Sequence, residues 1–382
     1  MRYYENHNLD GTVIEVHIAD IHFGSIDPAV QYSILFEQFI TPIRSLKFDI
    51  LSIDGDLFDK KFLASAPAID YANRFVMDCM SLCKEKQATM IILAGTRSHD
   101  ANQLSMFYGY CNRDDIDFRI VEHIQFEYAK GLKILCIPEE YGMPADYYAD
   151  MLCQTYDTVF MHGTVVGSIY GANKYILEST KAPIFNFEAF GGCRGPIIAG
   201  HVHKAACYNQ YIYYVSNPIR YRFGEEEEKG YAIVLHNPHS GHLYKFMPIH
   251  SFRYDTIDVN TITYTDPDTL ISYLDNLKNN GIDFIRIDFS NKNDPVTQSL
   301  VEKYYSNNPS FSIKRYSDNS SSTKTINNPV SENDKFKDMA FLVDKELDGY
   351  SKFVQFVNYN EGKQLLTVEM LKQIISGGRV TL

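Results

Sequence analysis

The feature that most constrains the fold is a series of short apolar runs, rich in β-branched residues, within the first 250 residues. Polar turns and amphipathic stretches separate these runs, and their nearly continuous apolar character is typical of buried strands. The runs are VIEVHIA, FDILSI, ATMIILA, LKILCIP, DTVFMH, GPIIAG, YIYYVS and YAIVLHN. The pattern predicts an α/β or mixed-sheet domain over residues 1–250.

Two of the intervening stretches have helical patterns. One covers residues 29–45 and is expected to end or kink near Pro42. The other covers residues 67–86, where Pro67 suits the first turn of a helix because its missing N–H has no partner there. The first domain therefore alternates strand and helix.

The rest of the chain has a different character. In a shorter unit at 251–316, the strand-like SFRYDTIDV and FIRIDFS flank a helical DPDTLISYLDNLKNNG, which predicts a small α+β domain. Residues 317–335 are rich in Ser, Asn and charge, the composition of a linker. Residues 336–382 carry two helix-like patterns, and TVEMLKQIISGG has an apolar face that must pack on the body or on a partner.

Composition narrows the class of protein. The net charge of −12 argues against a chain that binds nucleic acid through its overall field, so such a partner needs a local patch, metal ions or another subunit. The seven cysteines include no CxxC and predict reduced thiols. We find neither a secretory signal pattern nor an apolar run of about 18 residues, which predicts a cytoplasmic protein without membrane contact.

The functional signal lies at the ends of the predicted strands. Five of the apolar runs end in Asp or His, and the carboxyl ends of strands are where ligands gather in open α/β sheets. The segments are Asp20-Ile-His22, Asp54-Gly-Asp56-Leu-Phe-Asp59, GTRSHD with His99 and Asp100, His162-Gly, and Gly200-His201-Val-His203. Each motif alone is common by chance, but their joint occurrence at successive strand ends predicts a metal site.

The residue types indicate which metals. Residues i and i+2 of an extended segment point to one side, so Asp20 with His22, and His201 with His203, can each present two ligands. Mixed carboxylate and imidazole ligands suit Mn²⁺, Fe²⁺ or Zn²⁺. Two neighbouring metals need a bridging carboxylate, and Asp56, which follows Gly55 in a tight turn, is the expected bridge.

In this order, the motifs DxH, GDxxD, HD, H and GHxH resemble those of the calcineurin-like metallophosphoesterase superfamily. More narrowly, DIHFG, GDLFD and SNPIRYRFGEEEEKGYAIV resemble the SbcD-type DNA repair and recombination nuclease subunits. The likeness covers residues 12–260 and, more loosely, the small domain. It implies a sandwich of two mixed β-sheets flanked by helices, followed by a small α+β DNA-capping domain and C-terminal helices that dock on a partner.

The resemblance also implies roles for individual residues. Asp20, His22 and His203 would hold one metal, His162 and His201 the other, with Asp56 between them. The family's remaining ligand is the asparagine of a Gly-Asn-His-Asp loop, which is missing here. GTRSHD is two residues longer and places Ser98, a poorer ligand, before the histidine.

In the same loop, the resemblance makes His99 catalytic, with Asp100 orienting its ring. Arg97 either contacts a phosphate of the substrate or is an ordinary exposed loop arginine.

The function implied is a DNA nuclease that uses two divalent metal ions, most simply Mn²⁺, with 3′→5′ exonuclease and single-strand endonuclease activity. The same resemblance implies a homodimer that acts with an SbcC-like ABC-type ATPase. Two alternatives stay open: a phosphodiesterase or phosphatase for other substrates, and a scaffold subunit whose altered loop has lost catalysis.

Overall fold

The computed structural model describes residues 11–100, 102–144, 146–170, 174–175, 182–237, 239 and 241–315. The chain separates into one compact unit up to Ser317 and a second from Asp318. The linker predicted at 317–335 and the helices predicted at 336–382 lie outside the described residues, so these expectations stay predictions. Within the described residues, no helix is both long and apolar enough to span a membrane.

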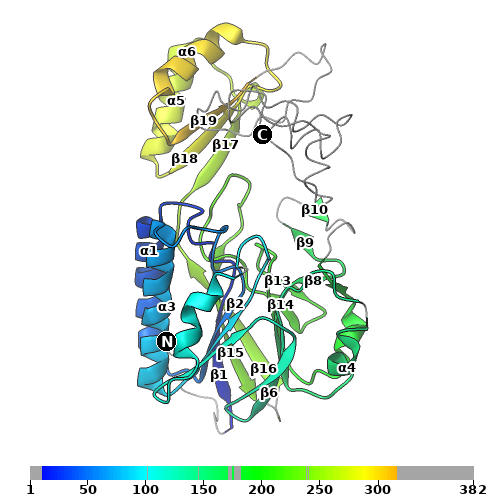
Figure 1. Cartoon of the computed structure of the whole chain (residues 1–382). Helices are drawn as coiled ribbons and strands as arrows, with labels where there is room; N and C mark the ends of the chain where they lie inside the picture. Colours follow the sequence, from blue (N-terminus) through cyan, green and yellow to red (C-terminus); the bar gives the residue numbers. More distant parts are fainter. Residues whose placement is uncertain are drawn as a thin grey trace, which may run out of the picture. The chain divides into compact units, whose positions relative to one another are not determined.

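The first of two large sheets carries the N-terminal strand in its middle (Figure 1). Its six strands have the order β16-β15-β1-β2-β3-β4, with β1 to β4 parallel and β15 and β16 antiparallel. The bounds are β1 Val13–Ile18, β2 Ile50–Asp54, β3 Thr89–Leu93, β4 Asp117–Val121, β15 Lys229–Asn237 and β16 Gly241–Ile249. Every residue of β2 and β3 is buried, as their apolar sequences predict.

Helices cover the outer face of this sheet. Helix α3 runs Pro67–Lys86, with the bounds expected from the sequence. The predicted 29–45 segment is α1 Pro28–Leu35, a π-helical turn Phe36–Ile40 and α2 Thr41–Arg44. The π-turn lies just before Pro42, which cannot donate a hydrogen bond and crowds the carbonyl four residues earlier, so a wider turn relieves the clash.

The second large sheet also has six strands, in the order β13-β14-β12-β7-β6-β5. Strands β6, β7, β12 and β14 are parallel, and β5 and β13 are antiparallel edges. The bounds are β5 Gln125–Ala129, β6 Leu132–Ile137, β7 Thr158–His162, β12 Ile197–Gly200, β13 Ala206–Tyr208 and β14 Ile212–Tyr214. Helix α4, Ala149–Leu152, and the 3₁₀ turn η4, Phe187–Phe190, pack on its outer face.

The two sheets pack face to face. Ile50 and Ile91 from the first sheet share an apolar cluster with Ile134, Cys136 and Phe160 from the second. Strand β2 lies against β7 and β12. The architecture is therefore α/β, with two mixed sheets flanked by helices, as predicted.

Short elements complete this part of the chain. They are the 3₁₀ helix η3 Leu104–Tyr110, the strand pair β8 Thr164–Val165 with β11 Ile184–Phe185, and the pair β9 Ile169–Tyr170 with β10 Lys174–Tyr175.

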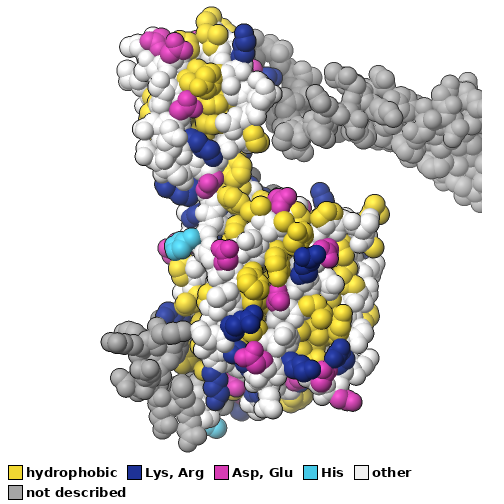
Figure 2. All heavy atoms as spheres, turned by 90° about the vertical axis from the view of Figure 1, so that its left-hand side faces the viewer, with side chains coloured by type: hydrophobic (Ala, Val, Ile, Leu, Met, Phe, Trp, Pro, Cys, Tyr) yellow, Lys and Arg dark blue, Asp and Glu magenta, His cyan; other side chains and the backbone are white. Residues whose placement is uncertain are grey.

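Residues 251–315 form a three-stranded parallel sheet with two helices and an apolar core of their own. Its elements are β17 Tyr254–Asp258, the 3₁₀ turn η5 Val259–Thr261, α5 Pro267–Asn279, β18 Phe284–Asp288, α6 Pro295–Tyr305 and β19 Phe311–Lys314. Asp266 and Asp294 cap α5 and α6. The sequence predicted β17, α5 and β18 but missed α6 and β19. Figure 2 shows hydrophobic and charged side chains mixed over the outer surface of these helices.

Candidate metal centre

Six strand ends, three from each sheet, deliver polar side chains to one edge of the sandwich. The strands are β1, β2 and β3 from the first sheet and β6, β7 and β12 from the second, and the three in each sheet are parallel. Sequence reasoning identified five of these ends and missed β6. Convergence of parallel strand ends is what brings residues far apart in the chain together.

The predicted ligands form two compact groups. Ligand atoms of Asp20, His22 and His203 lie within 4.8 Å of one another, and so do those of Asp56, His162 and His201. Members of both groups, together with His99, line one cavity of about 800 Å³. We call these sets the first and the second ligand group. Either could hold a metal ion.

Asp56 faces both groups. Its Oδ2 atom lies 3.7 Å from His22 Nε2 in the first group and 3.4 Å from His162 Nε2 in the second. The backbone N–H of Thr96 donates to its other carboxylate oxygen at 2.6 Å. The carboxylate is thus fixed between two sets of imidazoles, the position expected of a bridging ligand.

The backbone at these residues is unusual. Asp20, His22, Asp56 and His201 have φ values of 52°, 50°, 52° and 88°, in the left-handed region that non-glycine residues seldom adopt. Each such residue costs on the order of 1–3 kcal/mol and is retained where the surrounding structure fixes it. Hydrogen bonds from Asp20 N to Gly55 O (3.0 Å) and from His22 N to Asp56 O (2.9 Å) fix two of them. Strain concentrated on predicted ligands supports a functional role.

Three glycines allow the close approach of these segments. A Cβ on Gly55 would lie 2.2 Å from His162 Nδ1, and one on Gly95 would lie 2.2 Å from both the backbone N and Oδ1 of Asp56. A Cβ on Gly200 would lie 2.2 Å from the carbonyl oxygen of Asp54. Any larger residue at these positions would push the ligand groups apart.

His162 is held in a form suited to binding a cation. Its Nδ1–H donates to the carbonyl oxygen of Asp54 at 2.7 Å, so Nε2 is the ring atom that can bind a cation or, when no cation is bound, a proton. That Nε2 atom is buried without a hydrogen-bond partner in the part of the chain that the structure describes. It lies 3.4 Å from Asp56 Oδ2 and 3.6 Å from Glu139 Oε2. A cation among these acceptors would remove their mutual repulsion, and the carbonyl contact is the partner that metal-ligating imidazoles usually have.

The first group has a similar outer contact. His203 Nε2 lies 3.0 Å from His22 Nε2 and 3.7 Å from Asp20 Oδ1, while its Nδ1 lies 3.6 Å from Glu225 Oε1. The backbone N–H of His201 donates to the Asp20 carboxylate. Glu225, in the GEEEEKG segment, is a functional candidate that sequence reasoning did not single out.

Burial and charge shift the pKa values of the centre in opposite directions. Burial lowers the pKa of His22 to about 3, which keeps its ring neutral, and burial raises the pKa of Asp20. Burial alone would also raise the pKa of Asp56, but the neighbouring His162 holds it well below its usual range. Although burial disfavours a charged ring, Asp56 raises the pKa of His162. These carboxylates require a nearby positive charge, and a cation can supply it.

His99 lies beside the first group. Its ring centroid is 4.8 Å from that of His22, and its Nδ1 contacts the carbonyl oxygen of Asp59. Ligand atoms of His22, Asp59 and His99 also lie within 4.8 Å of one another. The predicted catalytic histidine is therefore within reach of the same cavity.

Asp100 was expected to orient the ring of His99, but its carboxylate contacts backbone groups instead. Its buried carboxylate accepts from the backbone N–H groups of Gly95 (3.0 Å), Phe58 (3.1 Å) and Leu57 (3.3 Å). Burial raises the pKa of this carboxyl to about 7, with the neighbouring Asp56 adding to the effect. Asp100 ties the loop after β3 to the loop after β2, and the carbonyl of Asp59 contacts the His99 ring instead.

Ser98 lies exposed and lines a surface pocket with Lys60, Lys61, Arg97 and Tyr141. Thr96 occupies the place where a loop ligand was expected. Its hydroxyl contacts Asp56 Oδ2 at 3.2 Å and Glu139 Oε2 at 2.9 Å. The two extra residues of GTRSHD thus follow Thr96, and counting forward from Gly95 would have identified it.

Glu139 is a third residue, after Glu225 and Thr96, that sequence reasoning missed. It follows β6, and its Oε2 lies 3.1 Å from His201 Nδ1 in the second group. Burial opposes its ionisation, but the hydrogen bond from His201 lowers the pKa of Glu139 to about 2. The run LKILCIP that precedes it was a predicted strand, so a search for any carboxylate after each strand would have found it.

Comparison with known proteins does not identify the site, so its interpretation rests on its own geometry. No family model matches the chain, and no curated protein matches it. One crystal structure aligns with 62% of this chain and 99% of its own, at 10% identity and a TM-score of 0.37. That likeness is too low to support an argument about fold family or function.

Proposed function

We propose that this protein is a metal-dependent phosphodiesterase of the calcineurin-like kind that cleaves DNA with two bound divalent cations. The observation that carries the proposal is the position of Asp56, whose Oδ2 lies within 3.7 Å of a ligand nitrogen in each group. A single carboxylate facing two separate sets of imidazoles is the arrangement that a pair of neighbouring cations requires.

The residues fit that pair. Asp20, His22 and His203 would hold one cation, His162 and His201 the other, with Asp56 shared. Mixed nitrogen and oxygen donors suit Mn²⁺, Fe²⁺ or Zn²⁺, and the sequence resemblance favours Mn²⁺ among these. The cations would lower the pKa of a bound water and offset the charge on the attacked phosphate.

The chain's own groups would perform the remaining tasks. His99 lies at the cavity beside His22, where its ring can donate a proton to the leaving oxygen. Asp59 and Asp100 hold the ring and the loop in place through the contacts described above. The left-handed turns and the close glycines fix the ligands before substrate arrives, so little reorganisation is needed.

A small cationic patch supports a polyanionic substrate. Lys60, Lys61 and Arg97 line a pocket with Tyr141, whose hydroxyl donates to Glu139 at 2.6 Å. In a chain of net charge −12, a local cluster of cations beside the candidate centre is the kind of patch that phosphates need. We propose that it receives the DNA backbone.

The wider setting rests on the sequence resemblance. We propose cytoplasmic DNA repair or recombination, a homodimer, and an SbcC-like ATPase that the 336–382 segment contacts. The same proposal includes exonuclease cleavage in the 3′→5′ direction and endonuclease cleavage of single-stranded DNA.

The test is a cleavage assay with the full chain. Labelled single-stranded and 3′-recessed DNA and a chromogenic phosphodiester are incubated with Mn²⁺ or with EDTA. We expect Mn²⁺-dependent DNA cleavage. Cleavage of the chromogenic substrate alone would favour a small-molecule phosphodiesterase, and metal binding without any cleavage would favour a scaffold.

A further inference from the structure

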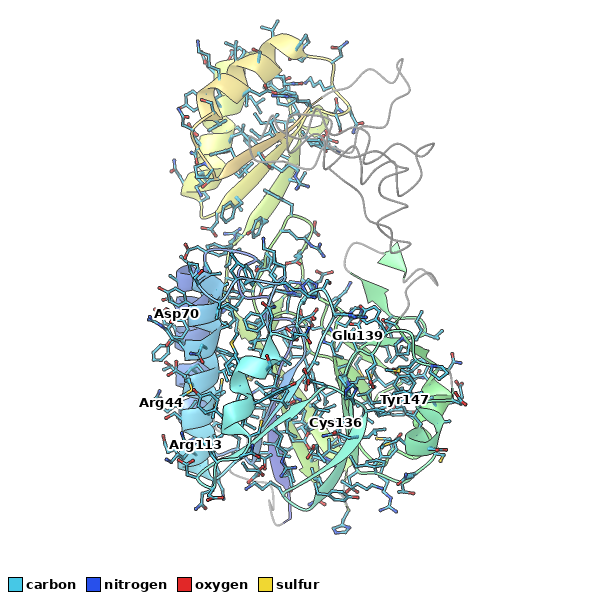
Figure 3. The ribbon with its side chains drawn as sticks, viewed as in Figure 1. Arg44, Asp70, Arg113, Cys136, Glu139 and Tyr147 are labelled. Carbon is cyan, nitrogen blue, oxygen red and sulfur yellow. The ribbon has the colours of Figure 1, made fainter. Side chains whose placement is uncertain are left out.

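A carboxylate, that of Glu139, lies beside the second ligand group, for which the resembling family supplies an amide. Glu139 lies at the end of β6, at the edge of the sandwich, whereas Cys136, three residues earlier, lies in the interior between the sheets (Figure 3). The Glu139 side chain is buried, and its Oε2 lies 3.1 Å from His201 Nδ1 and 3.6 Å from His162 Nε2. It thus faces both imidazoles of the group.

We infer that Glu139 is a direct ligand of the cation in the second group, replacing the amide that the GTRSHD loop lacks, and that Thr96 positions it beside Asp56. The inference rests on the proposed two-cation centre and specifies its chemistry.

The hydrogen bonds around Thr96 support this assignment. Its hydroxyl has one proton but lies within hydrogen-bond distance of two carboxylate oxygens, Asp56 Oδ2 at 3.2 Å and Glu139 Oε2 at 2.9 Å. One proton can satisfy only one of these acceptors at a time. The hydroxyl therefore holds the carboxylates of Asp56 and Glu139 side by side. His201, which also contacts Glu139 Oε2 at 3.1 Å, adds at most one more proton, so a cation between the two carboxylates would offset their charge.

The unpartnered nitrogen of His162 points to the same conclusion. Because Nδ1–H donates to the carbonyl oxygen of Asp54, Nε2 is the ring atom that faces the oxygens of Asp56 and Glu139, at 3.4 and 3.6 Å. A cation coordinated by these three atoms would satisfy all of them together. Tyr141 donates to the second oxygen of Glu139, which fixes the carboxylate's orientation.

The next residue shows what a purely structural glutamate looks like here. Glu140 is also buried, but it accepts from the backbone of Ile124 at 2.9 Å and the hydroxyl of Tyr147 at 3.0 Å, and it pairs with His123 at 2.8 Å. These contacts involve neither ligand group. Glu140 therefore offers a matched control for the same chemical change one position along.

A carboxylate in place of an amide adds a negative charge to the group. We expect it to bind a divalent cation more tightly than a neutral side chain would, because Coulomb attraction in a buried site is screened little. The departure in the loop would then leave the second cation firmly held.

The experiment counts Mn²⁺ ions bound to the full chain by calorimetry and by electron paramagnetic resonance. We expect two ions and a spin-coupled signal in the wild type and in Glu140→Gln. In Glu139→Gln we expect one of the two ions to lose affinity by at least ~10-fold, the least effect usual for residues that support a metal. The coupled signal should be lost at Mn²⁺ concentrations that saturate the wild type.

Two unaltered affinities in a folded Glu139→Gln variant would overturn the inference. If that variant fails to fold, anomalous scattering from Mn²⁺-soaked wild-type crystals decides: a Glu139 oxygen at roughly 2.0–2.6 Å from the ion supports the inference, and a longer distance overturns it. A different result would contradict the proposed function: a wild-type protein that binds two ions but does not cleave DNA.

Discussion

The two ligand groups differ in how openly the sequence displays them. The first comes from two short motifs, each at the end of an apolar strand. Asp20-Ile-His22 supplies two of its ligands, and the Gly-His-Val-His motif supplies His203. The second, Asp56 with His162 and His201, has beside it two residues that no motif marks, Thr96 and Glu139. This difference shows that a side chain can serve as a ligand because of its position in the fold, at the end of a strand that faces the cavity. The residue type at that place can change.

The largest expected effect comes from the residue that the two groups share. Asp56→Asn removes the charge that faces both, and each cation contributes several kcal/mol to the reaction. We expect cleavage to fall by more than ~10⁴-fold, with a loss of about 1.4 kcal/mol for each factor of ten. Mn²⁺ titration of the variant should show that both ions bind more weakly. If only one affinity changes, Asp56 belongs to one group alone.

His99→Ala separates catalysis from metal binding. We expect turnover of DNA to fall by about 10²–10⁴-fold, the usual contribution of a positioned acid or base. The variant should still bind the same number of Mn²⁺ ions as the wild type, because His99 lies beside the first group without belonging to its set. Loss of an ion would instead show that His22, Asp59 and His99 form a metal site.

Gly95→Ala tests how tightly the second group is packed. The new Cβ would meet the backbone and carboxylate of Asp56 at 2.2 Å, so either the loop or the bridge must move. We expect a loss of about 1–3 kcal/mol in the free energy of unfolding, the usual range for overpacking. Gly109→Ala is the control, since nothing lies within 4 Å of its position. Urea denaturation of both variants measures the difference, and equal midpoints would contradict the close approach.

The cationic patch predicts a smaller effect that depends on salt. Replacing Lys60, Lys61 and Arg97 with alanine should weaken DNA binding and reduce the slope of log K against log salt by roughly 0.7–0.9 for each phosphate that the protein no longer neutralises. The chromogenic phosphodiester should be hydrolysed at the wild-type rate, because it has no extended backbone. An unchanged salt slope would show that the DNA follows another path.

Most of the strands, helices and candidate ligands could be predicted from the sequence. The remaining elements and ligands could not, and the reasons are physical. Apolar β-branched runs and Pro67 define strands and helix α3 locally, and strand ends define where ligands collect. The loop GTRSHD could not be aligned correctly, because the position of an insertion depends on three-dimensional contacts such as Thr96 with Asp56. Helix α6 and strand β19 were missed because their apolar patterns are short and interrupted by polar residues.

A buried ion pair on strand β1 contrasts with His22, whose ring burial keeps neutral, and it predicts the smallest effect. His17 is fully buried and bonds Asp54 at 2.8 Å and Glu15 at 3.3 Å. Burial opposes protonation of His17, but attraction to Asp54 raises its pKa to about 9, above the unfolded value of 6.5. Because the folded state binds the proton more tightly, this pair stabilises the fold fully below pH 6.5, and the contribution is lost as the pH rises through 9.

The melting temperatures of the wild type and of His17→Gln in EDTA should therefore differ most near pH 6 and converge toward pH 9, the pKa of the folded state. A constant difference would mean that His17 contributes by packing, for example through its edge contact with Phe160, and carries no charge in the folded protein. That result would remove the contrast between a core imidazole held by its proton and the imidazole of His22, whose ring burial keeps neutral.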